Sequence, residues 1–250
     1  MSAPVPMIAG NWKMHGTAAA LAEAQQVAGA DLPAGVRVAL CPPATLVERM
    51  SRTLQGGPVL VGGQDCHPEP QGAHTGDVSA EMLAEAGAKL VILGHSERRA
   101  GYGESDEVVA AKVAAALRAA LEPVVCVGET LAEREGGKTL DVVTWQVRRS
   151  LPEALSARPF TVAYEPVWAI GSGLTPSLGD IEEVHAAIRE TLVEKFGEAG
   201  ARTAILYGGS VKPANAREIL ALPEVGGALV GGASLKASDF LGIIGAAGAR

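Results

Sequence analysis

Residues 90–99 read LVILGHSERR, a run of four apolar residues that ends at a glycine and then becomes polar. The same arrangement recurs at residues 123–128, PVVCVG, and a similar apolar run at residues 160–165, FTVAYE, ends at a polar residue, Glu165. Apolar runs without alternation are typical of parallel strands that are covered on both faces. Working outward along the chain gives eight such runs, which begin at Val5, Val36, Val59, Leu90, Pro123, Phe160, Ala204 and Gly227.

The segments between these runs are rich in Ala, Leu and Glu and predict helices. The best examples are Thr17 to Ala30, Ser105 to Ala120, Lys138 to Leu155 and Ser177 to Phe196. Eight strand–helix units in 250 residues predict an α/β protein with one (β/α)8 TIM barrel, a single domain over residues 1–250. The alternative, an open doubly wound sheet, usually carries a G-x-G-x-x-G turn, and the glycine clusters at residues 101 and 171 lack its third glycine.

Composition narrows the class of protein and its location. With 28 Asp+Glu against 21 Lys+Arg, a formal charge of −7 and only 4% aromatic residues, the chain is a poor candidate for binding nucleic acid or an anionic membrane. The three cysteines, Cys41, Cys66 and Cys126, have no CxxC spacing and predict reduced, packed thiols. The N-terminus lacks a signal-peptide pattern, and no segment has the ~20 apolar residues of a membrane helix. We therefore expect a cytoplasmic protein.

Polar residues that could take part in catalysis or binding follow the predicted strands. In a barrel of this kind the carboxyl ends of all strands meet at one mouth, where active sites lie. In chain order these residues are Asn11, Lys13, His95, Ser96, Glu97, Glu165, Ser210, Gly231 and Gly232. One cation, one imidazole, one carboxylate and several glycine-rich turns would therefore converge, and this convergence predicts a site more strongly than any single residue.

The glycine-rich turns predict a phosphate site. Gly209-Ser210 and Gly231-Gly232 can each present main-chain N–H groups just before a helix, which is a favourable position for an anion. One such turn alone is better explained as a tight connection that only glycine permits. Two neighbouring turns together with Lys13 favour the phosphate.

Glu165 and His95 suggest proton transfer. A carboxylate at a strand end can act as a general base once a lid excludes water, and an imidazole just before a helix is disfavoured as a cation. Taken singly, a surface glutamate and a helix-capping histidine are the better explanations. The segment from Pro166 to Pro176 carries Trp168 and other apolar residues on a loop, which predicts either a lid or a loop packed on the barrel rim.

Other patterns carry less weight. Residues 132–139, AEREGGKT, resemble a P-loop but start well after the strand and place two glutamates where triphosphate oxygens would lie. Four residues are able to bind zinc but have no recurring ligand spacing, so we predict no metal: Asp65, Cys66, His67 and His74. We expect His15 and His185 on the solvated surface, and Cys126 as a packed thiol.

From the first strand to the last helix, the chain resembles the triosephosphate isomerase family. The resemblance is carried in order by AGNWKM, CPP, GAHTGDVSAEML, LGHSERR, CVGETLAEREGGKT, AYEPVWAIGSGLTP, YGGSVKPANA and ALVGGASL. It implies an aldose–ketose isomerase that interconverts dihydroxyacetone phosphate and D-glyceraldehyde 3-phosphate in glycolysis and gluconeogenesis, with no metal or organic cofactor.

The resemblance also implies the role of each site residue. Glu165 would carry the proton between two carbons through an enediolate, and neutral His95 would polarise the carbonyl. Lys13 would balance the negative charge and Asn11 would hold a substrate oxygen. Ser96 would hold Glu165 while the lid, residues 166–176, is open, and Glu97 would pair with Lys13. Phosphate would be bound by the N–H groups of Gly171, Ser210, Gly231 and Gly232.

The family is typically a homodimer, and the segment Gly72 to Val78 resembles its interface loop. Four residues depart from the family pattern: Asp65 in place of Asn, His74 in place of a larger apolar ring, Ser172 in place of Thr, and Gly226 in place of Asp. Asp65 and His74 would affect the strength of the dimer, and Ser172 would affect the kinetics of the lid.

Two other functions stay open on the residues alone. One is another sugar-phosphate isomerase or an aldolase on a phosphate-binding barrel, for which a Schiff-base lysine inside a strand would be the sign. The other is a non-catalytic barrel, for which loss of Glu165 or Lys13 would be the sign, and both residues are present.

Overall fold

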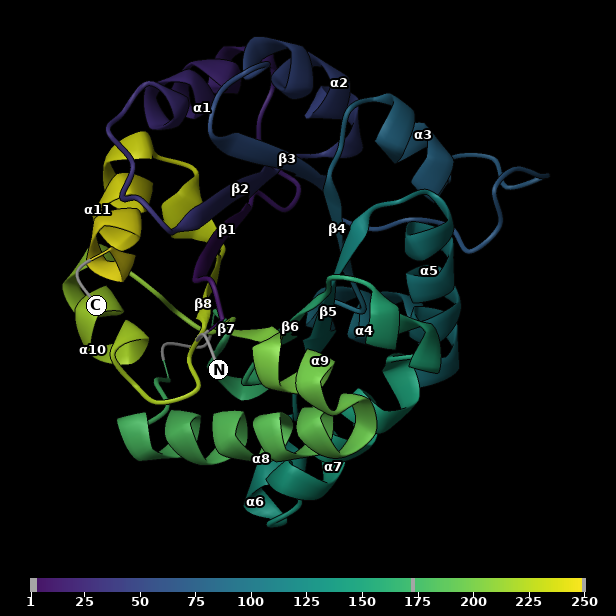
Figure 1. Ribbon diagram of the computed structural model, residues 1–250, viewed down its shortest axis with the longest axis vertical. Helices are drawn as coiled ribbons and strands as arrows, with labels where there is room; N and C mark the ends of the chain where they lie inside the picture. The colour runs from purple at the N-terminus through teal and green to yellow at the C-terminus, as the bar shows by residue number, and fades with distance from the viewer. Residues whose placement is uncertain (1–3, 172–173, 249–250) are drawn as a thin grey trace.

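Eight parallel strands close into one barrel in this computed structural model, which describes residues 4–171 and 174–248 (Figure 1). The strands pair in chain order, and the last pairs with the first. Their bounds are β1 Met7–Asn11, β2 Arg37–Cys41, β3 Val59–Gly63, β4 Leu90–Leu93, β5 Glu122–Val127, β6 Thr161–Tyr164, β7 Ala204–Tyr207 and β8 Gly227–Val230. Each of the eight apolar runs therefore contains one strand, and the predicted TIM barrel is confirmed.

Helices surround the barrel (Figure 1). They are α1 Leu21–Ala28, α2 Ala44–Thr53, α3 Ala80–Glu85, α4 Ser96–Tyr102, α5 Asp106–Arg118, α6 Leu131–Glu135, α7 Thr139–Ser150, α8 Leu178–Phe196, α9 Glu198–Arg202, α10 Pro213–Leu220 and α11 Ala237–Ala247. The helix predicted to run to Leu155 ends at Ser150, because Pro152 forces Leu151 into an extended conformation. None of the described helices has the length and apolar character needed to cross a bilayer.

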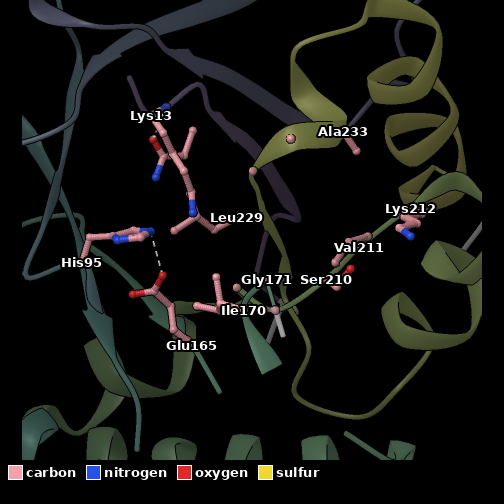
Figure 2. A pocket seen from close by; sticks show the side chains of 15 residues that line it. Lys13, His95, Glu165, Ile170, Gly171, Ser210, Val211, Lys212, Leu229 and Ala233 are labelled. Atoms are coloured by element: carbon pink, nitrogen blue, oxygen red, sulfur yellow. Dashed lines mark hydrogen bonds and ion pairs between the residues drawn. The ribbon is translucent and has the colours of Figure 1, made fainter. Parts of the chain in front are cut away.

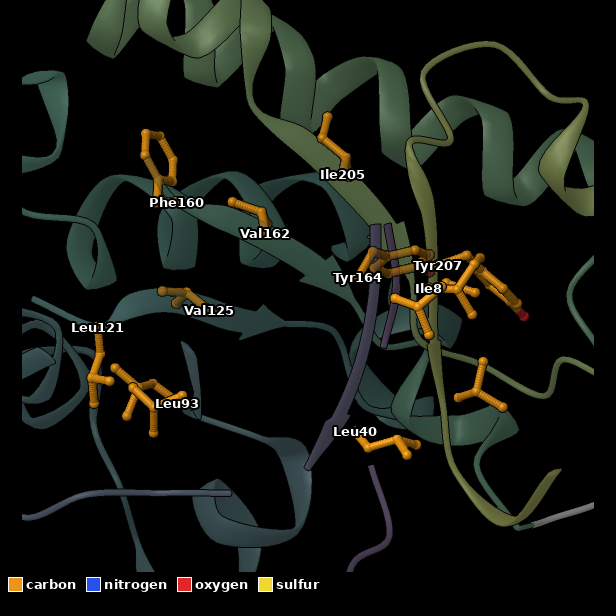
Figure 3. Packing of buried hydrophobic residues seen from close by; sticks show 14 of the residues in the cluster. Ile8, Leu40, Leu93, Leu121, Val125, Phe160, Val162, Tyr164, Ile205 and Tyr207 are labelled. Carbon is orange, nitrogen blue, oxygen red and sulfur yellow. The ribbon is translucent and has the colours of Figure 1, made fainter. Parts of the chain in front are cut away.

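Apolar residues fill both sides of the strands. Alternate residues such as Met7, Leu90 and Ile92 belong to a small cluster inside the barrel. Their neighbours, such as Ile8 and Val162, belong to a larger cluster between the strands and the helices (Figure 3). Because both faces of the sheet are buried, the strands need no polar face, which explains the unbroken apolar runs in the sequence.

Glycine is required at the start of β8. Gly227 has φ +142°, and a Cβ there would lie 1.9 Å from the carbonyl oxygen of Met7. The preceding residue is Gly226, one of the departures from the family pattern, where a Cβ would lie 2.9 Å from the main-chain nitrogen of Ile205. Close approach of three neighbouring strands therefore leaves little room for side chains at this end of the barrel.

The prediction of a solvated His185 is wrong. The side chain is fully buried on the face of α8 that also carries Ile181 and Ile188, one helical turn away on either side. Its Nδ1 lies 3.2 Å from the carbonyl oxygen of Glu224, which gives the ring one polar partner inside the core. His15 is exposed, as predicted.

Burial of His185 makes stability depend on pH. Burial disfavours the imidazolium and lowers the pKa of His185 from 6.5 to about 4. The unfolded chain therefore binds this proton first, so the free energy of unfolding is highest above pH 6.5 and decreases as the pH falls towards 4. The full decrease from this group is about 3 kcal/mol, at 1.36 kcal/mol for each pKa unit.

Urea unfolding at several pH values and one protein concentration measures this effect. The variant His185→Gln, which cannot take up a proton, should lack this part of the decrease between pH 6.5 and 4. Parallel stability curves for the parent and the variant would show that His185 does not contribute.

Candidate active site

A cavity of about 300 Å³ opens at the carboxyl ends of the strands (Figure 2). Its wall includes these residues predicted from the sequence: Asn11, Lys13, His95, Glu165, Gly171, Ser210, Gly231 and Gly232. Ile170 and Leu229 add apolar surface. Ser96 and Glu97 do not line this cavity, but each contacts a residue that does. The closed barrel thus brings together residues that lie more than 200 positions apart in the sequence.

Glu165 and His95 contact each other in the wall of the cavity. Glu165 directly follows β6 and is only 1% exposed. One carboxylate oxygen, Oε1, lies 2.8 Å from Nε2 of His95, as the dashed line in Figure 2 shows. The other, Oε2, accepts a hydrogen bond of 2.9 Å from the main-chain N–H of Ser96. The carboxylate is therefore held in a defined position by both of its oxygens.

The position of His95 determines which ring nitrogen carries the proton. His95 is the residue that caps the N-terminus of α4, and its Nδ1 accepts a hydrogen bond of 3.1 Å from the N–H of Glu97. Nδ1 therefore presents a lone pair, and these hydrogen bonds assign the proton of a neutral ring to Nε2. Nε2–H is the atom that points to Glu165.

The two groups stabilise each other's charged forms while they are in contact. Burial acts to raise the pKa of Glu165, but His95 and the N–H of Ser96 outweigh it and hold that pKa below its ordinary value. Burial likewise acts against a charged His95, but the Glu165 carboxylate outweighs it and raises the pKa of the imidazole. Separating the pair removes these opposing effects, so that burial then favours a more basic carboxylate and a neutral ring.

Lys13 is held at the cavity by an unusual backbone conformation. Its φ of +53° is uncommon for a residue with a Cβ. The side chain of Asn11 accepts the Lys13 N–H at 3.0 Å, and the amide of Gln64 donates to the Lys13 carbonyl at 2.9 Å. The ammonium group then forms an ion pair of 2.6 Å with Glu97.

Gln64 holds the main chain of Lys13, and the sequence alone did not point to it. Its amide bridges two segments, because it also donates to the carbonyl of Cys41 at 2.8 Å. The only signal in the sequence is its position directly after β3, which is the position that other site residues have after their strands.

The turns after β7 and β8 form the opposite wall of the cavity. A Cβ on Gly209 would lie 2.2 Å from the hydroxyl of Tyr207, so the first turn requires glycine. Asn215 fixes this turn, because its side chain accepts the Lys212 N–H at 2.8 Å and donates to the Ser210 carbonyl at 3.1 Å. Asn215 lies inside α10, and nothing in the local sequence marked it as part of the site.

The turn after β8 approaches the cation directly. A Cβ on Gly231 would lie 3.5 Å from Cε of Lys13, and the 3-10 helix Gly232–Ser234 begins at the next residue. Lys13 and this helix start thus lie on the same part of the wall. A lysine and a helix start are both favourable partners for a phosphate group.

The first half of the segment 166–176 is anchored to the barrel. Val167–Ala169 form a 3-10 helix, and Trp168 donates a hydrogen bond of 2.7 Å to the buried carboxylate of Glu129. Tyr164 donates to the same oxygen at 3.2 Å. Gly171 lies at the cavity edge. Ser172, the departure noted in this segment, lies outside the described residues.

Residues 132–139, which resemble a P-loop, belong mainly to two helices. They span the end of α6 and the start of α7. The Glu133 carboxylate accepts the N–H of Thr130 at 2.7 Å, which is a capping arrangement at the start of α6. The N–H groups of Gly136, Gly137 and Lys138 donate to carbonyls of the same segment, so they are not presented as in a phosphate loop.

The four residues weighed as zinc ligands do not form one cluster. Cys66 is buried with Sγ towards the carbonyl of Lys112, and Asp65 forms an ion pair with Lys112. His67 and His74 stack with ring centroids 3.8 Å apart, and Asp77 lies close to both. Because Nδ1 of His67 accepts the N–H of Glu69, the ring proton lies on Nε2, where a metal would need a lone pair.

Comparison with known proteins identifies the family. The family model described as triosephosphate isomerase matches residues 6–247. The triosephosphate isomerase of Caulobacter vibrioides is 61% identical over 243 residues, which cover 96% of each chain. That of Ruegeria sp. is 58% identical over 240 residues, which cover 96% of this chain and 97% of the relative.

A solved structure agrees in fold over nearly the whole length. The crystal structure of triosephosphate isomerase from Bartonella henselae has a TM-score of 0.90 and 49% sequence identity, and the match covers 97% of this chain and 98% of that one. The alternative of a Schiff-base aldolase is not favoured, because none of the eight described strands contains a lysine. The chain therefore belongs to the triosephosphate isomerase family of aldose–ketose isomerases.

Proposed function

We propose that Glu165 is the base and His95 the electrophile in the interconversion of dihydroxyacetone phosphate and D-glyceraldehyde 3-phosphate, the reaction that this protein catalyses. This reaction is a step shared by glycolysis and gluconeogenesis. The single observation that carries the assignment of roles is the 2.8 Å contact between the buried carboxylate of Glu165 and Nε2 of His95 at the cavity wall.

The first chemical step is removal of a proton from carbon. Glu165 leaves His95 and takes a proton from C1 of dihydroxyacetone phosphate, and the C–H electron pair moves into the C1–C2 bond. The C2 carbonyl oxygen gains the negative charge and accepts a hydrogen bond from Nε2–H of His95. The product of this step is an enediolate.

The second step returns the proton to the neighbouring carbon. His95 gives its Nε2 proton to the oxygen on C2 and takes the hydroxyl proton from the oxygen on C1. Glu165 then donates its proton to C2, which yields the aldehyde at C1. A neutral ring suits this exchange, because a cationic ring would give up its proton too early.

The remaining groups bind the phosphate and the negative charge. Lys13 faces the substrate dianion, and Asn11 holds a substrate oxygen. The phosphate accepts hydrogen bonds from the N–H groups of the turns after β7 and β8 and from Gly171, while the segment 166–176 closes over it. Closure excludes water, which strengthens these interactions and protects the enediolate from losing phosphate.

We assign all of residues 1–250 to one catalytic domain, since the site takes residues from the first strand and from the last. Removal of the Glu165 carboxylate tests the proton chemistry, and replacement of Lys13 tests the arrangement of charge. A chain that kept parental turnover after both changes would contradict the proposal.

A homodimer with the segment Gly72 to Val78 at its interface is the second part of the proposal. Every residue from 71 to 77 is exposed, and the segment projects from the barrel beside α3 (Figure 1). Met14, next to the catalytic lysine, is 94% exposed, which is unusual for so apolar a side chain. Asp65 brings no unpaired charge to this region, because Lys112 and Arg98 neutralise it from within the same chain.

Sedimentation of the purified chain tests the dimer. The parent should sediment at twice its chain mass of 25.5 kDa. Met14→Glu should sediment as a monomer, since it would bury an unpaired charge in the interface. The matched control is Trp145→Glu on α7, which changes another exposed apolar residue and should leave the dimer intact. A monomeric parent, or a dimeric Met14→Glu, would contradict the proposed interface.

We also place the protein in the cytoplasm, where its glycolytic substrate is found, without a nucleic-acid or membrane partner. All three cysteines are buried as free thiols, and burial raises the pKa of Cys41 and of Cys66 to about 12. Such thiols are unreactive and fit a reducing compartment.

A further inference from the structure

Gln146 on α7 forms a pair of hydrogen bonds with the main chain of Gly128. Its Oε1 accepts the Gly128 N–H at 2.7 Å, and its Nε2 donates to the Gly128 carbonyl at 3.2 Å. Gly128 directly follows β5, one residue beyond the last pair of the β5–β6 ladder, Val127 with Tyr164. A side-chain amide thus satisfies both polar groups of a residue that the sheet no longer holds.

Gly128 lies in direct contact with the backbone of the catalytic carboxylate. A Cβ on Gly128 would lie 1.7 Å from the carbonyl oxygen of Glu165 and 2.7 Å from its carbonyl carbon. The Glu165 N–H also donates to the carbonyl of Val127 at 2.8 Å, immediately before Gly128. Any shift of Gly128 therefore shifts the main chain from which the base projects.

The same short segment supports the start of the lid. The N–H of Val167 donates to the carbonyl of Glu129 at 3.1 Å. Residues 128 and 129 thus lie beneath both the base and the first residues of the lid. Gln146 holds this segment from the helix layer outside the barrel.

Close packing holds Gly128 on the side of the Glu165 backbone, and a cavity borders it on another side. A second cavity of about 230 Å³ lies on this side of the base, and its wall includes Gly128, Gln146, Glu165, Ser96 and Val167. On the side that faces this cavity, the two hydrogen bonds of Gln146 restrain Gly128.

We propose that Gln146 is a positioning residue for the reaction, which sets the place of Glu165 by holding Gly128. This inference rests on the proposed role of Glu165 as the base. Gln146 lines the cavity behind the base and not the substrate cavity, so it acts on the chemical step and not on phosphate binding.

The first test replaces Gln146 by methionine, which has a similar length and lacks both hydrogen bonds. We expect kcat to fall by about 10- to 100-fold, because displacement of a reacting group by about 1 Å has a cost of this size. KM for dihydroxyacetone phosphate should stay within about twofold, since the phosphate turns are unchanged. The matched control is Val147→Ala, a buried change on the same helix, which should destabilise the fold and keep kcat.

The second test uses Gln146→Glu and the pH profile. An ionised glutamate accepts the Gly128 N–H but cannot donate to its carbonyl, whereas a protonated glutamate does both. The ratio of variant to parental kcat should therefore rise as the pH falls from 8 to 5. A flat ratio, or a kcat of Gln146→Met no lower than that of Val147→Ala, would overturn the role of Gln146.

Combining Gln146→Met with Glu165→Asp separates this inference from the proposal on which it rests. If Gln146 acts through Glu165, the loss in the double variant is smaller than the product of the single losses. Fully multiplicative losses would overturn the inference alone. Parental activity in Glu165→Gln, which lacks the carboxylate, would instead overturn the role of Glu165 as the base.

Discussion

Replacing Glu165 by glutamine is expected to lower kcat by at least about 10³-fold while KM changes little. Glutamine has the same shape but cannot accept a proton from carbon, and general base catalysis contributes up to about 10⁴-fold. The amide has one oxygen for the two donors, the N–H of Ser96 and Nε2–H of His95, so one of these contacts is lost, but the overall fold should be preserved. A coupled assay in both reaction directions measures the loss.

Isotope exchange adds a second readout for this variant. In D2O the parent should introduce deuterium into the substrate carbon, because a carboxylic acid exchanges its proton with solvent, and the variant should not. Glu133→Gln is the matched control, since Glu133 is a capping residue on α6 outside the substrate cavity. Turnover of Glu165→Gln within tenfold of the parent would remove Glu165 from its proposed role.

Replacing Lys13 by methionine is expected to lower kcat/KM by about 10³-fold, with a rise in KM as well as a fall in kcat. A charge pair about 4 Å apart near a protein surface is worth about 4 kcal/mol, which corresponds to this factor. The formal charge of the chain is −7, so a dianion depends on local cations to bind. The change also leaves the carboxylate of Glu97 without its partner beside the cavity.

Lys212→Met is the matched control for Lys13. Lys212 also lines the cavity, but it is exposed, and its charge is better screened by solvent. Its replacement should lower kcat/KM by less than about tenfold. Equal losses in the two variants would show that the cavity needs only a general positive potential, and that the defined position of Lys13 has no special role.

The contact between Glu165 and His95 bears on the proposed mechanism. With the carboxylate bound to Nε2–H and to the N–H of Ser96, both reacting groups are stabilised where no substrate lies between them. Substrate must separate them, and separation favours the more basic carboxylate and the neutral ring that the reaction needs.

Much of this protein could be predicted from residues that are close together in the sequence. Apolar runs without alternation, most of them ending at glycine, predicted eight parallel strands, because strands covered on both faces have no polar face. Since strand ends in a barrel share one mouth, the same pattern located His95, Glu165 and the two glycine-rich turns. The sequence also placed His15 at the surface. The prediction for His185 was wrong, because the sequence did not show which face of its helix would be buried.

The partners that hold the site together were decided only by the tertiary structure. Gln64 reaches back 51 residues to Lys13, and Gln146 reaches back 18 residues to Gly128. Nothing local marks these side chains, since a polar residue on a helix or after a strand usually faces water. The sequence by itself determined the strands, the mouth of the barrel and many of the residues that line it, because periodicity and strand ends are local properties. Which amide satisfies which carbonyl depends on how distant segments pack, and only the closed barrel decides it.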